Sequence, residues 1–349
     1  MWHWKFFPDY RASNPYQDLL AHALSGEADV RPGTITDALE ALALGQVVFH
    51  LHWEDVLYAG APTEAAASAN IDIFLCQLAV FRELGGRLVW TLHNAGPHEN
   101  RFPALSARLR VTLAGQADIV HVHGGVAANF ARDAGAAPER ILIVPHPNLA
   151  PAYPNDISDE AARRYFRFQR HETVFAFLGA RRGYKGVDDL LRAFAEVHRV
   201  TPAAQLLLGG RQQTGSEARF LMPSPGVRLI PRFIDDGIVQ YVLGSADYVV
   251  LPYRRILTSG AVALALGFER PVIVPDLAPL LEVVQPDREA LVFRAGDQGD
   301  LERVMLKACA QSEITRRGLR SEARRTGEAV TFTHLAAALV DRLESARRG

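Results

Sequence analysis

The sequence predicts two doubly wound α/β domains, each built on a parallel sheet with helices on both faces. Three observations favour this fold class. Short apolar runs alternate with helical patterns along the whole chain, and these runs are apolar at nearly every position. A turn-rich segment, Pro145-His146-Pro147-Asn148, lies between two halves of similar size. The length of 349 residues also fits two domains of roughly 100–200 residues each.

In the first half, apolar runs of strand length alternate with stretches that place apolar residues at helical spacing. Strands are expected at Trp2–Phe7, Gln46–Leu51, Arg87–Leu92, Ile119–His123 and Ile141–Pro145, and helices near Thr34–Leu44, Glu64–Leu84, Leu105–Ala114 and Val126–Ala134. These elements define an N-terminal domain at residues 1–150.

The second half continues the alternation and defines a C-terminal domain at residues 151–330. Strands are expected at Thr173–Gly179, Gln205–Gly209, Val227–Ile230, Tyr248–Pro252 and Pro271–Val274, and helices near Val187–Val200, Asp235–Gly244, Ala261–Phe268 and Asp300–Ser312. Residues 331–349 contain one last amphipathic helix, Thr331–Arg348.

Composition narrows the function classes. The 38 basic and 39 acidic side chains lack the positive excess of a nucleic-acid-binding protein. Cys76 and Cys309 have neither disulfide nor metal-type spacing, which favours a reducing cytoplasm. The first residues do not resemble a signal peptide, and the apolar runs are shorter than the ~20 residues that cross a bilayer. We therefore expect a cytoplasmic protein.

Charge and histidine are unevenly distributed along the chain. Residues 1–150 carry a formal charge of −5 and residues 151–349 carry +4, whereas nine of the twelve His lie in the first part. This distribution favours an anionic ligand on the second domain. Solvated faces with an incidental bias are the alternative.

The strongest functional signal follows the strand Thr173–Gly179. The segment Gly179-Ala180-Arg181-Arg182-Gly183-Tyr184-Lys185-Gly186 combines glycines, which allow a close backbone approach, with Arg182 and Lys185. Arginine binds phosphate oxygens in pairs, and lysine acts as a mobile point charge. The segment predicts a phosphate-binding loop, with an ordinary solvated loop as the alternative.

A second loop predicts the same chemistry after the strand Tyr248–Pro252. Ser259 is suited to cap the helix Ala261–Phe268, and Gly260 leaves room for a ligand at its N-terminus. Free N–H groups and the helix dipole bind anions there, although simple helix capping would explain the same residues. The two loops together predict one phosphate site.

These motifs resemble the glycosyltransferases of the GT-B fold, in particular the family-4-like group. The sequence is also similar to bacterial exopolysaccharide glycosyltransferases such as the xanthan-pathway β-mannosyltransferase. The matching segments are Asn14-Pro15-Tyr16, His50-Leu51-His52-Trp53, Thr91-Leu92-His93-Asn94, Pro97-His98-Glu99, Arg182-Gly183-Tyr184-Lys185-Gly186, Leu251-Pro252-Tyr253, Ser259-Gly260 and Arg270-Pro271-Val272-Ile273.

The resemblance implies two Rossmann-like domains facing across a cleft, with a nucleotide-sugar donor held mainly by the C-terminal domain. The donor would be GDP- or UDP-linked, and no other cofactor and no metal are expected. The last helix would cross back onto the N-terminal domain. The implied donor-binding residues are Gly179, Arg182, Lys185, Arg211, Phe233, Tyr253, Thr258, Ser259 and Gly260.

One departure from the family pattern concerns two glutamates with seven residues between them. Counting back from Pro271, these positions fall on Ile256 and Leu264, and neither side chain can hydrogen-bond a sugar or a ribose. The sequence therefore does not predict whether the reaction retains or inverts the anomeric configuration.

The catalytic candidates follow two strands of the N-terminal domain. Glu99 and Glu54 are candidate bases, provided that a cleft wall raises the carboxyl pKa. The resemblance places His93 near the donor sugar, where it would orient the donor or relay a proton. For either glutamate, a surface or core role is the alternative.

Acceptor binding is expected at the same strand ends and in the first β–α loop. Trp53 offers an apolar face for a sugar ring, and a Pro-containing helix start is the alternative role for the first loop. The candidates are Asn14, Tyr16, His52, Trp53 and Asn94. The acceptor would be a glycan or a lipid-linked glycan.

Two further patterns in the sequence fit either a functional role or a purely structural one. The His-x-His pairs at 50/52 and 121/123 lie on one strand face each and could chelate zinc, but the sequence shows no third ligand. The residues Arg101, Phe102, Leu105, Arg108, Leu109, Arg110 and Leu113 could form a membrane-binding stripe at the inner face of the cytoplasmic membrane, or a plain amphipathic helix.

The sequence thus predicts a metal-independent glycosyltransferase that moves a hexose from a nucleoside diphosphate to a glycan or lipid-linked acceptor in polysaccharide or glycoconjugate synthesis. Two alternatives share the fold. A sugar-nucleotide epimerase would also cleave the anomeric C–O bond, and the missing glutamates would suit a non-catalytic sugar-nucleotide-binding partner.

Overall fold

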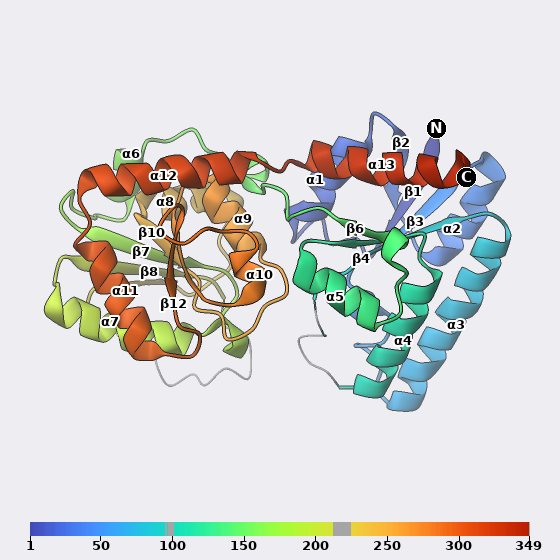
Figure 1. The fold of residues 1–349 in the computed structure, drawn as a ribbon, viewed down its shortest axis with the longest axis horizontal. Helices are drawn as coiled ribbons and strands as arrows, with labels where there is room; N and C mark the ends of the chain where they lie inside the picture. Colours follow the sequence, from blue (N-terminus) through green and yellow to red (C-terminus); the bar gives the residue numbers. More distant parts are fainter. Residues whose placement is uncertain (95, 97–100, 212–224, 349) are drawn as a thin grey trace. The chain divides into compact units, whose positions relative to one another are not determined.

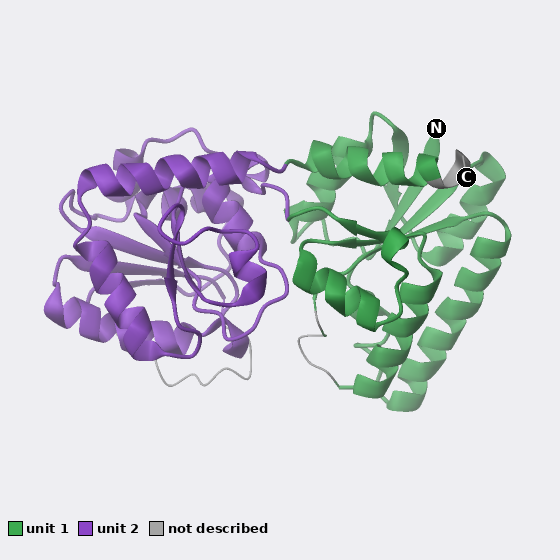
Figure 2. Cartoon of the chain, in the orientation of Figure 1, with its two compact units in different colours: residues 1–145, 331–349 green, residues 146–330 purple. Residues whose placement is uncertain are grey.

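The chain forms two compact units (Figure 2). The computed structural model describes residues 1–94, 96, 101–211 and 225–348. Unit 1 comprises Met1–Pro145 and Thr331–Gly349, and unit 2 comprises His146–Val330. The boundary between the units lies after Pro145, and not at residue 150 as predicted, because the residues from His146 onward pack within unit 2. For example, a Cβ added to Gly267 would meet the side chain of Asn148.

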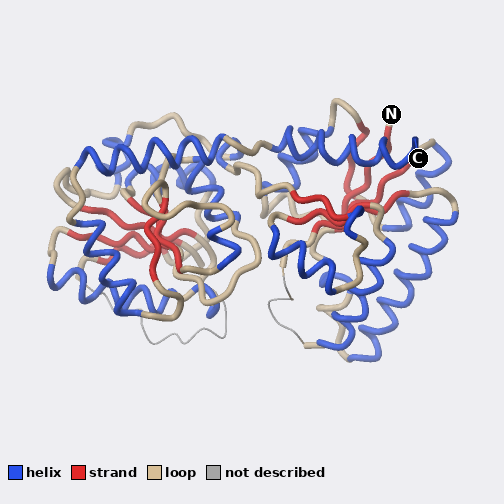
Figure 3. The backbone as a smooth tube through the Cα atoms, in the orientation of Figure 1, coloured by secondary structure: helices blue, strands red, loops and turns tan. Residues whose placement is uncertain are grey.

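Unit 1 is built on six parallel strands in the order β2-β1-β3-β4-β5-β6 (Figure 3). The strands are β1 (Trp2–Phe7), β2 (Ala28–Pro32), β3 (Val47–Leu51), β4 (Arg87–Thr91), β5 (Ile119–Val122) and β6 (Ile141–Ile143). The helices are α1 (Pro15–Leu24), α2 (Ile35–Ala41), α3 (Glu64–Glu83), α4 (Pro103–Gln116), α5 (Gly125–Asp133) and α13 (Phe332–Arg348).

The strand order decides which helix covers each face of this sheet. The connection from β1 to β2 crosses the sheet in the opposite direction to the later ones, so right-handed crossovers place α1 on one face and α2, α3 and α4 on the other. Helix α13 packs beside α1 (Figure 1). The side chains between α1, α13 and the sheet include most of the buried histidines described below.

Among the described helices, α3 alone is long and apolar enough to match a membrane span by length and composition, with a mean hydropathy of 1.3. From the sequence alone no apolar run of this length is expected, so α3 corrects that expectation. The helix packs on the sheet through Phe74 and Phe81, whose rings lie 6.2 and 6.4 Å from that of Phe49. Helices in the core of a folded domain can have the same length and apolar composition as a membrane span.

Unit 2 is built on a second parallel sheet, in the order β12-β11-β10-β7-β8-β9. The strands are β7 (Thr173–Leu178), β8 (Ala204–Gly209), β9 (Val227–Ile230), β10 (Tyr248–Val250), β11 (Val272–Pro275) and β12 (Ala290–Phe293). The helices are α6 (Asp159–Tyr165), α7 (Val187–Val200), α8 (Asp236–Ser245), α9 (Gly260–Gly267), α10 (Ala278–Leu281), α11 (Gln298–Cys309) and α12 (Glu313–Glu328).

The point where the strand order reverses lies at β7. From β7 the chain proceeds to β8 on one side, and later returns to β10 on the other. Ligands of doubly wound sheets bind at the carboxyl ends of the strands beside such a point. In this unit the loops after β7 and β10 therefore occupy the expected position.

Every predicted strand is present, with ends shifted by at most two residues. The predicted α/β fold class with two doubly wound sheets is thus confirmed. Strands β2 and β12 and helices α1, α6, α10 and α12 are missing from the predicted elements. The first is a polar edge strand, Ala-Asp-Val-Arg-Pro, the second has only four residues, and α12 is rich in arginine with few apolar side chains.

Candidate functional site

Two basic side chains lie in the loop between β7 and α7. A short turn, Gly183–Lys185, carries the chain from Arg182 to Gly186, which has a left-handed backbone with φ of +66°. The ammonium of Lys185 lies beside Gly179, where an added Cβ would stand 2.9 Å from Nζ. Glycine at 179 therefore leaves the space that the ammonium occupies.

The electrostatics of this loop favour an anion. Burial, and secondarily the charge of Arg182, lowers the pKa of Lys185 to about 8, so the ammonium remains mostly charged at neutral pH. The Nε of Arg182 is buried and has no hydrogen-bond partner in the described chain. Among the ion pairs of the described residues, none includes Arg182 or Lys185. Two partly buried cations without a carboxylate partner are stabilised by a bound anion.

The loop between β10 and α9 ends in a capped helix N-terminus. The Oγ of Ser259 accepts a hydrogen bond from the N–H of Val262 at 3.3 Å and donates one to the hydroxyl of Tyr253 at 3.4 Å. Tyr253 is buried, whereas Thr258 and Gly260 are partly exposed. Ser259 is therefore a helix cap, which both explanations of this loop predict, and a helix N-terminus of this kind can bind an anion.

The two loops are in direct contact. The peptide N–H of Arg254 donates a hydrogen bond to the carbonyl oxygen of Tyr184 at 2.8 Å. A Cβ on Gly186 would stand 1.9 Å from the carbonyl oxygen of Pro252, so only glycine permits this approach. The strands that lead into the loops are neighbours, with Tyr248 paired to Phe175. The predicted basic residues and helix cap thus lie at one edge of one sheet.

Arg254 and Arg255 differ in their roles despite being adjacent. The guanidinium of Arg254 binds the carboxylate of Asp189 in α7 through two hydrogen bonds of 2.8 and 3.0 Å. This pair fixes the second loop to the first helix. Arg255 is exposed.

The remaining predicted donor residues lie on the loops after β8 and β9. Gly210 has φ of +136°, and an added Cβ would stand 1.9 Å from the carbonyl oxygen of Gly179. Arg211 follows it and is exposed. Phe233, in the loop after β9, is 61% exposed, which is unusual for a phenylalanine. Because the sheet order is β10-β7-β8-β9, these loops form a row that begins at Ser259 and ends at Phe233.

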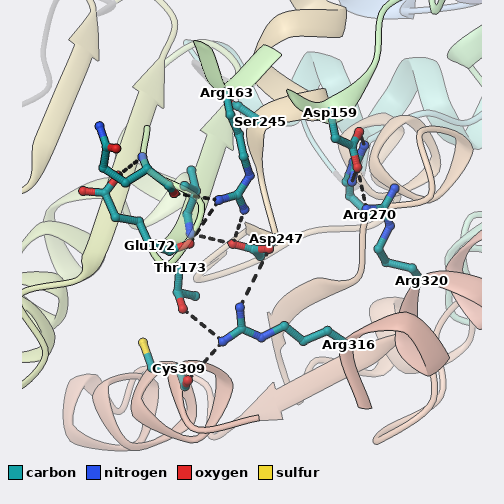
Figure 4. Close-up of polar contacts among 12 residues, drawn as sticks. Asp159, Arg163, Glu172, Thr173, Ser245, Asp247, Arg270, Cys309, Arg316 and Arg320 are labelled. Atoms are coloured by element: carbon teal, nitrogen blue, oxygen red, sulfur yellow. Dashed lines mark hydrogen bonds and ion pairs between the residues drawn. The ribbon is translucent and has the colours of Figure 1, made fainter. Parts of the chain in front are cut away.

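The arginine–carboxylate network of unit 2 lies at the opposite, amino-terminal edge of the same sheet. Asp247, which precedes β10, accepts hydrogen bonds from Arg163 at 2.7 Å and from the N–H of Val174 at 2.8 Å (Figure 4). Arg316 of α12 donates to Thr173 at the start of β7, at 3.1 Å. The network ties α6 and α12 to the sheet and is separate from the candidate site.

In unit 1, the residues after β3 and β4 form a compact aromatic cluster. His93 is buried, and its Nε2 lies 3.0 Å from Nδ1 of His52. Its ring stacks on the indole of Trp53, with centroids 4.3 Å apart and planes 12° apart. The edge of Tyr16 lies against the same imidazole at 5.1 Å. Trp53 itself is partly exposed and also contacts Tyr10.

A row of hydrogen bonds crosses the sheet beneath this cluster, with one polar group from each neighbouring strand. The indole N–H of Trp4 can only donate, so Nδ1 of His50, at 3.3 Å, accepts. Nε2 of His50 then donates to the hydroxyl of Thr91 at 2.7 Å, and that hydroxyl donates to Nδ1 of His121 at 3.1 Å. Nε2 of His121 donates to the carbonyl of Val144 at 3.4 Å. The two ends of the row thus fix every tautomer along it.

The described histidines of this region are arranged for hydrogen bonding and stacking. Burial lowers the pKa of His50 and of His52 well below the usual value for histidine. His121 and His123 both lie near the carbonyl of Val144. Within the described ranges, no three His, Cys, Asp or Glu side chains form a group that could hold a metal ion.

The structure is unfavourable for Glu54 as a general base. Its carboxylate is buried and forms an ion pair with Arg110 at 2.6 Å, and it also accepts a weak hydrogen bond from Trp90. Arg110 donates a further hydrogen bond to the carbonyl of Asn94 at 3.0 Å. These contacts favour a structural role in which Glu54 and Arg110 hold the loop after β4. The other candidate base, Glu99, lies outside the described residues.

Three of the five predicted acceptor residues have structural roles. Asn14 caps α1 by accepting a hydrogen bond from the N–H of Tyr16 at 3.1 Å. Tyr16 and His52 are buried, so neither side chain is presented to an acceptor. Burial raises the pKa of the Tyr16 hydroxyl. Trp53 and Asn94 are partly exposed at the carboxyl edge of the sheet.

Of the two explanations for the stripe around α4, the structure supports the plain amphipathic helix, because its apolar side chains face the core. Phe102, Leu109 and Leu113 are buried. The basic residues of the stripe are engaged as well: Arg108 pairs with Asp72 at 2.9 Å, and Arg101 donates to the carbonyl of Ala61 at 3.1 Å. The pattern is that of an amphipathic helix packed on its own domain.

Comparisons with known proteins agree with this architecture. Residues 172–311 match the family model described as "Glycosyl transferases group 1". The chain is 25% identical over 272 residues to a GDP-mannose:glycolipid 4-beta-D-mannosyltransferase of Xanthomonas campestris pv. campestris, a match that covers 75% of this chain and 70% of that protein.

Solved structures with the same fold cover nearly the whole chain. Anabaena Alr3699/HepE in complex with UDP superposes with a TM-score of 0.77 at 13% identity, covering 99% of this chain and 100% of that one. Sucrose-phosphate synthase from Thermosynechococcus elongatus has a TM-score of 0.74 with the same identity and coverage, 13%, 99% and 100%. The resemblance predicted from the motifs is confirmed: the chain has the GT-B fold, and its residues 172–311 match the glycosyltransferase group 1 family model.

Proposed function

We propose that the protein transfers a hexose from a nucleoside diphosphate sugar to a hydroxyl group of a glycan or a lipid-linked glycan. One observation carries the proposal. Arg182 and Lys185 have no ion-pair partner in the described chain, and they lie on a loop that is hydrogen-bonded to the loop of the capped α9 N-terminus. Cations and free N–H groups at one sheet edge suit a diphosphate.

The same groups would assist departure of the leaving group. Glycosyl transfer passes through an oxocarbenium-like state, in which negative charge develops on the departing diphosphate. Lys185, Arg182 and the N-terminal N–H groups of α9 would stabilise that charge without rearrangement. We propose that this stabilisation needs no metal ion, so chelation would leave donor binding unchanged.

The row of loops after β10, β7, β8 and β9 gives the donor a direction. With the diphosphate at Arg182 and Lys185, the nucleobase would lie toward Arg211 and Phe233, whose exposed ring is suited to stack on a base. The hexose would lie toward Thr258 and Ser259. At Ile256 and Leu264 the chain offers no carboxylate to that sugar.

The donor we propose is GDP-mannose, with UDP-sugars as the competing choice. Support for GDP-mannose comes from the Xanthomonas relative, whose name specifies that donor and a glycolipid acceptor. Support for UDP comes from the fold neighbour that was solved with that nucleotide. A lipid-linked acceptor would place the reaction at the cytoplasmic face of a membrane, in polysaccharide or glycoconjugate synthesis.

Unit 1 would supply the acceptor side of the reaction. Trp53 and Asn94 are partly exposed at the carboxyl edge of its sheet, and an indole face is suited to stack on a sugar ring. We propose that His93 acts on the reacting groups, because its ring is held in a defined orientation among Trp53, Tyr16 and His52.

A thermal-shift screen of GDP, UDP, ADP and dTDP, with and without EDTA, tests the proposal. A nucleotide that binds the folded protein raises the melting temperature by mass action. GDP should give the largest shift, with UDP next, and EDTA should leave it unchanged. Incubation of the matching sugar nucleotide with acceptors should then yield a glycoside. Conversion to an isomer without acceptor would instead show an epimerase, and binding without turnover would show a non-catalytic protein.

A further inference from the structure

The hydrogen bond between His52 and His93 links a buried side chain to the candidate catalytic histidine. His52 Nδ1 and His93 Nε2 are 3.0 Å apart, and both rings are buried. Their rings are close to parallel, with centroids 5.3 Å apart and planes 25° apart. Because Nε2 of His93 is committed to His52, His93 would act on a ligand through Nδ1.

The ring plane of His93 is fixed by its other neighbours. The indole of Trp53 stacks on it at 4.3 Å, and Tyr16 presents its edge at 5.1 Å. By themselves, these two contacts still leave the imidazole the freedom to flip by 180° within the same plane. The hydrogen bond to His52 removes that freedom, because the flipped ring would present a carbon to Nδ1 of His52.

The ring of His52 is in turn held in place by its contact with His50. Its ring stacks on that of His50, with centroids 4.1 Å apart and planes 28° apart. His50 is fixed on both sides, by the indole N–H of Trp4 at 3.3 Å and by the hydroxyl of Thr91 at 2.7 Å. These two hydrogen bonds fix the ring of His50, on which the ring of His52 stacks.

The protonation state of His52 completes the argument. Burial lowers its pKa well below the usual value, so the imidazole is neutral. One proton therefore lies between His52 Nδ1 and His93 Nε2, and either nitrogen can carry it. When His52 Nδ1 carries the proton, Nε2 of His93 accepts the hydrogen bond, so a neutral His93 carries its proton on Nδ1 and donates there. With the proton on His93, the bond supports a His93 that accepts there.

We propose that His52 is a positioning residue, which holds Nε2 of His93 and so directs Nδ1 of His93 toward the substrate. This inference rests on the proposed function, in which His93 acts on the reacting groups. It assigns His52 a role different from the predicted contact with the acceptor, which its burial opposes.

Three variants separate positioning from packing. His52→Leu removes the hydrogen bond, whereas His52→Asn keeps a polar atom near the place of Nδ1. His121→Leu is the matched control, since it also removes a fully buried imidazole from the same sheet, but one that is bonded to Thr91 and Val144. Melting temperatures show which variants fold.

The first measurement is long-range ¹⁵N–¹H NMR of the imidazoles in the whole protein, and it needs no substrate. In the wild type, the Nε2 resonance of His93 should show a hydrogen bond to the ring of His52, in either tautomer. That signature should disappear in His52→Leu and persist in His121→Leu. A wild-type spectrum without this hydrogen bond overturns the inference, whether or not the variants fold.

The second measurement compares kcat and KM for breakdown or transfer of the sugar nucleotide identified by the thermal-shift screen. We expect His52→Leu to lower kcat about 10- to 100-fold, because a displacement of about 1 Å at a reacting group has an effect of this size. The donor KM should stay within about twofold, His52→Asn should recover most of the loss, and His121→Leu should keep kcat. Equal losses in both Leu variants would overturn the inference. Absence of donor binding in the wild type would instead contradict the proposed function.

Discussion

The peptide N–H of Arg254 lies 2.8 Å from the carbonyl oxygen of Tyr184 and joins two loops that come from neighbouring strands. This bond, together with the close approach of Gly186 to Pro252, holds the loop that carries Arg182 and Lys185 against the loop that leads into α9. Neither loop alone would distinguish a phosphate site from an ordinary turn. Their contact is what supports our proposal of an anion site at the carboxyl edge of β7 and β10.

The first prediction concerns Gly186→Ala. The new Cβ would stand 1.9 Å from the carbonyl oxygen of Pro252, on a backbone with φ of +66°. We expect the free energy of unfolding to fall by about 2–3 kcal/mol, since both strain and overlap contribute. Nucleotide binding should weaken as well, because the loops must separate.

Gly183→Ala is the control for that substitution. It lies in the same loop, has ordinary φ and has open space around its added Cβ. Urea unfolding of both variants provides the comparison. Equal stability of the two variants would contradict the account of the loop contact.

The second prediction concerns the buried pair of Glu54 and Arg110. Glu54→Gln removes the carboxylate that pairs with the mostly buried guanidinium of Arg110, so the free energy of unfolding should fall by about 3 kcal/mol. Replacing both residues, Glu54→Leu with Arg110→Met, should restore most of the stability. A Glu54→Gln variant with wild-type stability but no turnover would show that Glu54 is the base after all.

The third prediction concerns pH. Burial keeps His50 and His52 neutral in the folded state, and it lowers the pKa of His146 to about 4. The unfolded chain binds protons at these residues as pH falls through about 6.5, whereas the folded chain does not. The free energy of unfolding should therefore be highest above about pH 6.5. Below that pH it should decrease by about 1.4 kcal/mol per pH unit for each imidazole.

Urea unfolding between pH 7.5 and 5 measures this dependence. His146→Gln should reduce the slope by about one proton, because that residue titrates only near pH 4 when folded. Stability that stays constant or rises as pH falls from 6.5 to 5 would contradict the neutral, buried state of these histidines.

Local patterns in the sequence are sufficient for much of this fold. Nearly continuous apolar runs mark the strands, and the basic glycine-rich loop with Lys185 and the cap at Ser259 are visible because each feature spans only a few neighbouring residues. The elements that are missed, such as β2 and α12, have too few apolar side chains to produce a periodic signal.

The roles that the sequence does not predict depend on contacts between distant segments. Glu54 has a carboxylate that could act as a base. In the folded protein, however, it forms a largely buried ion pair with Arg110, which lies 56 residues later in the sequence. The His-x-His pairs can be recognised in the sequence, but the role of their imidazoles depends on the strand order. The order β3-β4-β5 places Thr91 between His50 and His121, so that its hydroxyl bonds to both. The same tertiary packing buries Tyr16 and His52.

Calorimetric titration of GDP and UDP into the wild type and into Lys185→Ala and Lys307→Ala tests the central claim most directly. Lys307 is the control because it is an exposed lysine of unit 2 that pairs with Asp287. The account predicts that Lys185→Ala weakens nucleotide binding about tenfold or more, an effect of at least ~1.4 kcal/mol, while its melting temperature and Lys307→Ala binding match the wild type. Wild-type affinity in a folded Lys185→Ala variant would contradict the assignment of the diphosphate to this edge of the sheet.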